Sequence, residues 1–146
     1  MLAGTAAKKP SQANLRRAAS TTYYAMFHFL AKTSADLLLG GDGADRGKMA
    51  WRQTYRALEH ALAKKACKNS AMIGKFPAAI QDFANAFATM QEKRHDADYD
   101  PHVRFTKSEV LQDIVLVEKV IKDFSCERKK DRRAFCAAVL FKYRPK

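Results

Sequence analysis

The feature that most constrains this chain is an apolar stripe of helical spacing that ends on a charged residue. Apolar residues recur at steps of four, three, four and three over residues 76–90, a pattern typical of one face of an amphipathic helix. The next step of four reaches Arg94, the first residue of segment 94–101 (RHDADYDP). A cation on a buried face is costly unless it is paired or used. The sequence therefore predicts a packed helix with a functional or ion-paired site at its end.

The rest of the chain also reads as helical. No run of alternating apolar and polar residues indicates a strand. Ser11 is a candidate N-cap, and residues 106–109 (TKSE) form a capping box before another helix. We therefore expect one all-α domain over residues 1–146, an up-and-down bundle of four to five helices, with residues 1–10 flexible. The expected helices cover residues 11–39, 48–66, 76–95, 106–124 and 131–142.

The net charge of +12 is concentrated at the two ends of the chain. Residues 1–35 hold five basic residues and no acidic ones, and residues 119–146 hold ten basic and three acidic residues. The residues between them carry twelve of each sign. If the ends meet in the fold, they form one basic surface that attracts a polyanion such as RNA.

Several classes of protein are not indicated. The three cysteines are scattered and form no C-x-x-C pair, which favours reduced thiols over a disulfide framework or a zinc site. No stretch approaches the ~18 apolar residues that span a bilayer, and no secretory h-region follows the first lysines. Residues 95–102 hold two histidines and three aspartates, but without the spacing that places two histidines on one helix face. We expect a cytoplasmic protein with no metal, no cofactor and no membrane partner.

Two segments together resemble a known family. Residues 15–28 (LRRAASTTYYAMFH) are similar to the first-helix signature of HEPN domains. Residues 94–100 (RHDADYD) resemble the R-x-x-A-D-Y segment of a small branch of that family. The resemblance covers most of the chain and implies an α-helical up-and-down bundle that forms a homodimer. It also implies a place among RNA-processing, defence or toxin–antitoxin proteins, many of which are metal-independent endoribonucleases.

In that family an arginine and a histidine, spaced R-x4-6-H, form a composite site at the dimer seam. The arginine stabilises charge on the phosphate, and a base accepts the proton of the ribose 2′-hydroxyl. Here Arg94 matches the arginine, but Tyr99 and Asp100 stand where the histidine is expected, and His102 lies one step beyond the window. His95 is adjacent to Arg94 and points about 100° away on a helix. The candidate catalytic residues are Arg94, His95 and His102.

We favour a structural interpretation of the same segment slightly over a catalytic one. Asp98 can pair with Arg94 within or across a dimer, and Tyr99 can donate a hydrogen bond, so that the segment fixes a dimer. The candidate seam residues are Tyr24, Arg94, Asp98 and Tyr99. His28 and His60 are interpreted as packing or boundary residues.

The leading functional hypothesis is an RNA-associated or toxin–antitoxin module with a homodimeric seam, and with a nucleotidyltransferase-type protein as a further partner. The alternatives are an active ribonuclease toxin and a purely structural or protein-interaction bundle. The first and last helices of a bundle often adjoin, so we expect basic residues from both to form one phosphate-contacting patch. The candidate RNA-binding residues are Arg16, Arg17, Arg128, Lys129, Lys130, Arg132 and Arg133.

Overall fold

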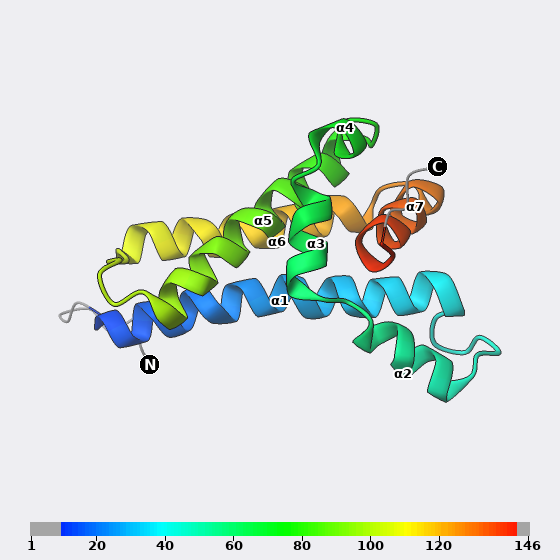
Figure 1. The fold of residues 1–146 in the computed structure, drawn as a ribbon, viewed down its shortest axis with the longest axis horizontal. Helices are drawn as coiled ribbons and strands as arrows, with labels where there is room; N and C mark the ends of the chain where they lie inside the picture. The colour runs from blue at the N-terminus through cyan, green and yellow to red at the C-terminus, as the bar shows by residue number, and fades with distance from the viewer. Residues whose placement is uncertain (1–9, 143–146) are drawn as a thin grey trace.

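The computed structural model of the chain describes residues 10–142, and it confirms the expected all-α bundle (Figure 1). No strand occurs in that part of the chain. The expectation of a flexible start concerns residues 1–10, of which residues 1–9 lie outside the described residues. The helices of residues 10–142 are α1 (Gln12–Leu39), α2 (Lys48–Arg56), α3 (His60–Cys67), α4 (Ser70–Ile73), α5 (Ala78–Tyr99), α6 (Lys107–Ser125) and α7 (Lys129–Leu140).

Three long helices, α1, α5 and α6, form the body of the bundle. Figure 1 shows α5 running opposite to α1 and α6, and each of the three packs against the other two. The apolar stripe predicted for residues 76–90 is buried between them, since Ile80, Phe83 and Phe87 are fully buried. Each large buried aromatic side chain contributes about 3–5 kcal/mol relative to alanine. The stripe therefore holds α5 firmly in place up to the turn that carries Arg94.

The predicted helix starts at Ser11 and Thr106 are confirmed. The Ser11 side chain accepts a hydrogen bond from the Asn14 N–H, and Thr106 accepts one from the Glu109 N–H. Helix α5 continues to Tyr99 and stops at Asp100, because the residue before a proline disfavours helical backbone. The segment that resembles the family motif therefore lies almost entirely on the last turns of a helix.

The single helix predicted for residues 48–66 is wrong. The chain forms two helices there, α2 and α3, with Glu59 in extended conformation between them. Neither glycine nor proline marks the break in the sequence. The break allows Leu58 to be buried and turns α3 across α1, while α2 lies along the second half of α1 (Figure 1).

Candidate functional site

Arg94 lies on the inner side of α5 against two aromatic rings of α1. Its guanidinium carbon is 5.4 Å from the centre of the Tyr23 ring and 5.7 Å from that of Tyr24, within the range of cation–π attraction. Nη1 donates to Asp98 Oδ2 at 3.4 Å, and Nε is buried with no acceptor among the described residues. The side chain is 12% exposed. The cation is thus held in place by aromatic faces, and its ion pair is long.

A histidine from α3 completes the group around these rings. His60 Nδ1 lies 2.6 Å from the Tyr23 hydroxyl, and its ring stacks on Phe27 with centres 4.2 Å apart. Tyr23 and Tyr24, the rings that carry Arg94, also contact the His60 ring. We call Tyr23, Tyr24, Phe27, His60 and Arg94 the Arg94 cluster.

Burial and charge shift the titration of two members of the cluster. Burial is the main cause that lowers the pKa of His60, and the charge of Arg94 lowers it further. The His60 imidazole is therefore neutral at pH 7. Burial also raises the pKa of Tyr23 far above its ordinary value, against the opposing charge of Arg94, so the hydroxyl stays protonated. The cluster combines a permanent cation, a neutral imidazole and a phenol in one place.

Sequence reasoning interprets His60 only as a packing or boundary residue, and the structure adds its hydrogen-bond contact with Tyr23 and its place beside Arg94. No spacing connects His60 to Arg94, because the two lie on different helices and meet only through the break between α2 and α3. The available signal is the aromatic run of residues 23–27 on α1, which offers flat faces to a cation or an imidazole. That signal indicates a neighbour of this kind without identifying it.

The other residues of the motif divide between the cluster and the surface. Asp98 pairs with Arg94 within the same helix, four residues on. Tyr99 is 67% exposed, and its ring lies against exposed His95 with centres 4.9 Å apart. His102 is exposed in the loop after α5, where its N–H donates to Asp100 Oδ1. Among residues 10–142, neither His95 nor His102 forms a hydrogen bond with Arg94.

The guanidinium of Arg16 is used in contacts within the fold. Its guanidinium donates to the carbonyl oxygens of Asp96 and Ala97 at the end of α5 and to that of Val103 in the following loop. It also lies over the Phe105 ring, 5.7 Å from the centre. These contacts connect the start of α1 to the end of α5.

The two groups of candidate RNA-binding residues do not form one patch within the chain. Arg17 is exposed near the start of α1, whereas α7 packs against the far half of that helix (Figure 1). Ser34 of α1 lies beside Cys136 of α7, and 18 residues of helix separate Arg16 from Ser34, about 27 Å. The expected proximity is therefore wrong, because the helices adjoin only at one end of α1. On α7 and its N-cap, the exposed basic residues are Arg128, Lys129, Lys130 and Arg133, while Arg132 donates to the Glu127 carbonyl.

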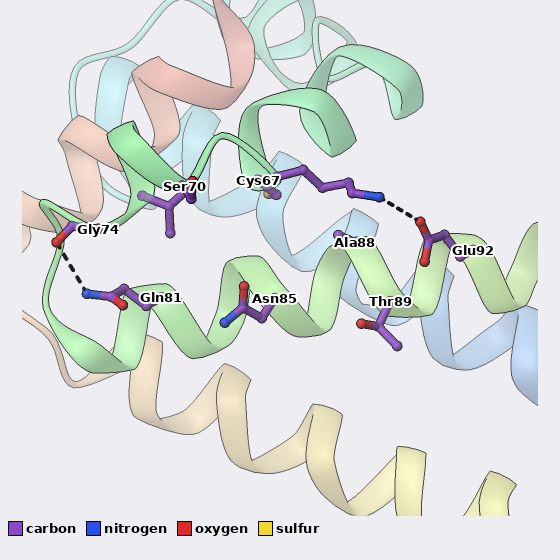
Figure 2. Close-up of a pocket in the computed structure, with 10 residues that line it drawn as sticks. Cys67, Ser70, Gly74, Gln81, Asn85, Ala88, Thr89 and Glu92 are labelled. Carbon is purple, nitrogen blue, oxygen red and sulfur yellow. Dashed lines mark hydrogen bonds and ion pairs between the residues drawn. The ribbon is translucent and has the colours of Figure 1, made fainter.

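A hollow of about 550 Å³ between α3, α4 and α5 is the main alternative to the cluster (Figure 2). Gln81 donates to the Gly74 carbonyl across it, and Lys68 pairs with Glu92 at 3.0 Å. Burial raises the pKa of the Cys67 thiol to about 12, which leaves it unreactive near neutral pH. Among the described residues, the hollow therefore offers polar contacts but no free cation, imidazole or reactive thiol.

Within residues 10–142, no three His, Cys, Asp or Glu side chains gather closely enough to hold a metal ion. None of the helices described combines the length and apolar character that crossing a bilayer requires.

Comparison of the chain with protein-family models, with curated proteins and with solved structures finds no match.

Proposed function

We propose that this chain is an RNA-associated helical module that resembles the HEPN family and uses the Arg94 cluster to hold a phosphate of the RNA backbone. The supporting observation is the incomplete pairing of Arg94. A guanidinium has five N–H donors, and among residues 10–142 that of Arg94 makes one hydrogen bond, at 3.4 Å. Charge-assisted bonds from arginine to phosphate are strong and often bidentate.

The proposal includes a homodimer and a cytoplasmic setting, where RNA is available. Tyr99 and His95 are exposed beside each other on the last turns of α5, next to the turn that carries Arg94. A second copy that covered them would bring two Arg94 clusters toward one seam. A nucleotidyltransferase-type protein of a toxin–antitoxin pair is the further partner in this proposal. Light scattering of the parent and of Tyr99→Ser tests the seam, and a monomeric parent contradicts it.

A second candidate function, metal-independent endoribonuclease, is favoured by the position of His60. With its ring proton on Nδ1, His60 donates to the Tyr23 hydroxyl, and the lone pair on Nε2 can accept a proton from a ribose 2′-hydroxyl. The 2′-oxygen then bonds to the adjacent phosphorus, and the bond to the 5′-oxygen breaks. The protonated imidazole returns its proton to that leaving oxygen, while Arg94 stabilises the charge on the phosphate.

One assay separates these functions. The parent, Arg94→Ala and His60→Asn are incubated with a mixed RNA pool in the presence of EDTA, then analysed on denaturing gels and by filter retention. Asparagine places a polar group near the position of His60 Nδ1 but has no atom at the position of Nε2. Retention of intact RNA by the parent that falls with salt and is lost in Arg94→Ala supports the module. Cleavage by the parent alone, lost in both variants, supports the nuclease. RNA that is neither retained nor cut contradicts both and leaves the structural or protein-interaction bundle.

A further inference from the structure

A row of flat side chains connects α2 to the Arg94 cluster. The Trp51 and Tyr55 rings have centres 5.4 Å apart and planes 29° apart. Tyr55 and His28 are 6.2 Å apart at 18°, and His28 and Tyr24 are 6.1 Å apart at 29°. Arg94 then lies over Tyr24. Four stacked rings and one guanidinium, contributed by three helices, thus follow one another without interruption.

The row is accessible at the surface. His28 is exposed, and Trp51, Tyr55 and Tyr24 are each partly exposed. Helix α2 buries none of its residues. Centre-to-centre distances above 5 Å at small interplanar angles are those of offset rings, and an offset leaves part of each ring face uncovered by its neighbour. The row can therefore accept further flat groups on the parts of the ring faces that the neighbouring rings and the Arg46 guanidinium, which lies over Trp51, leave uncovered.

A basic stripe runs beside the row on α2. Lys48, Arg52 and Arg56 are spaced by four residues and are all exposed, and α2 contains no acidic residue. Arg52 and Arg56 each follow an aromatic residue of the row by one position, about 100° around the helix. The charges of this stripe therefore lie alongside the rings, whereas the Arg46 guanidinium lies over the Trp51 ring, 4.8 Å from its centre, and pairs with Asp36 and Asp42. The basic stripe lies within residues 36–118, which carry equal numbers of basic and acidic residues.

The geometry points to a track for single-stranded RNA, and we propose that RNA bases stack on Trp51, Tyr55, His28 and Tyr24 while phosphates contact the basic stripe and Arg94. This inference rests on the proposed RNA association and adds the form of RNA that is bound. Aromatic platforms beside a basic groove are how proteins bind single strands without reading sequence. A duplex fits poorly, because its bases are already stacked and paired and cannot reach the rings.

The only tryptophan of the chain, Trp51, is in the row, so its fluorescence reports base stacking directly. The parent is titrated with an unstructured RNA of ~12 nucleotides, within the range one such surface covers, and with a blunt duplex of equal length. We expect the single strand to quench Trp51 and to bind at least ~10-fold more tightly than the duplex, since each stacked base contributes about that factor. Retention of RNA without quenching, or equal affinity for the duplex, overturns the track.

Variants test the rings and the stripe separately, with affinity measured by the anisotropy of a labelled RNA. Trp51→Ala and Tyr55→Ala are expected to lose about 5- to 100-fold in affinity, and the phenylalanine variants, which keep a ring, are expected to lose less. Circular dichroism shows whether each variant stays helical. Equal affinities for the parent and both alanine variants contradict base stacking.

Salt dependence tests the phosphate contacts. Arg52→Gln is expected to make the slope of log affinity against log salt less negative by about 0.7, the value for one phosphate contact on a single strand. Lys122→Gln, an exposed site on α6 away from α2, is the matched control and is expected to keep the parental slope. An equal change of slope in both variants means that only the net charge matters, and it overturns the proposed phosphate contacts of the basic stripe.

The failures of the two proposals can be told apart. If the parent binds no RNA, the RNA association fails and the track fails with it. If the parent binds RNA and Arg94→Ala does not, but Trp51 is not quenched, only the track fails. Binding to vesicles rich in phosphatidylserine with no affinity for RNA would overturn both and identify a basic, aromatic membrane surface.

Discussion

Arg16 and Arg94 are two largely covered arginines that the fold uses in different ways. The Arg16 guanidinium donates to three backbone carbonyls, those of Asp96, Ala97 and Val103. The Arg94 guanidinium rests on two aromatic faces, with one long bond to a carboxylate. Because the two residues have the same side chain and the same charge, the number of hydrogen-bond acceptors around each guanidinium decides its role. An arginine whose donors are used holds the fold together, and one whose donors are free can bind a ligand.

The two arginines are also connected. Arg16 holds the carbonyls of the last turn of α5, the turn that follows Arg94 and contains Asp98. A small apolar group around it, which includes Leu15, Ala97 and Phe105, is separate from the main core. Arg16 therefore stabilises the end of the helix on which the candidate site lies.

The largest effect on stability is expected from Arg16→Ala, about 2–4 kcal/mol lost from the free energy of unfolding. Hydrogen bonds to a charged group contribute about 1.5–3 kcal/mol each, and those made by one side chain do not add fully. Urea denaturation followed by circular dichroism measures the change. Arg17→Ala is the matched control, since Arg17 is exposed and, among the described residues, bonds only Asn14; a change within about 0.5 kcal/mol is expected there. Similar losses in both variants would contradict the structural role of Arg16.

Tyr23→Phe is expected to cost about 1 kcal/mol, the net contribution of one hydrogen bond. The variant keeps the ring against Arg94 and removes only the hydroxyl that bonds His60. Denaturation measures the loss of stability. Tyr55→Phe removes the bond to exposed His28 instead and should cost less, because solvent can replace that partner. The reverse order would contradict the placement of His60 in a covered site.

The pH dependence of stability is expected to show a smaller contribution from His60. Its pKa is lower in the folded chain than in the unfolded chain, so the unfolded chain binds more protons just below pH ~6.5. Stability is therefore full above that pH and falls as the pH drops. One group changes the free energy of unfolding by at most about 1.4 kcal/mol per pH unit, and the partly exposed ring gives less.

The measurement is the free energy of unfolding between pH 7.5 and 5.5 for the parent and for His60→Asn. The difference between them isolates His60 from the other titrating groups. A steeper fall in the parent is expected. Parallel curves would show that His60 titrates as it does in water, and they would remove the support for a neutral imidazole beside Arg94.

The sequence predicts the long helices well, and the candidate site only in part. The apolar stripe of α5 and the caps at Ser11 and Thr106 are local patterns, and local patterns determine where these helices lie. The break before His60 carries no glycine or proline signal, because it is produced by the burial of Leu58 and the contact with Tyr23. Arg94 could therefore be identified from one helix, whereas its imidazole neighbour depends on how three helices pack.

Arg94→Met is expected to change stability by less than about 1 kcal/mol and to decide most about function. Methionine keeps the length and apolar contact of the side chain, and removing one partner of an ion pair is costly only where the remaining charge is buried. Asp98 is left unpaired but is about one-third exposed, so water can solvate it. Denaturation and RNA retention are measured on the same preparation. Retention is expected to be lost from a fully folded protein. A large loss of stability would instead make Arg94 a structural residue like Arg16, and the difference between the two arginines would no longer support a ligand site.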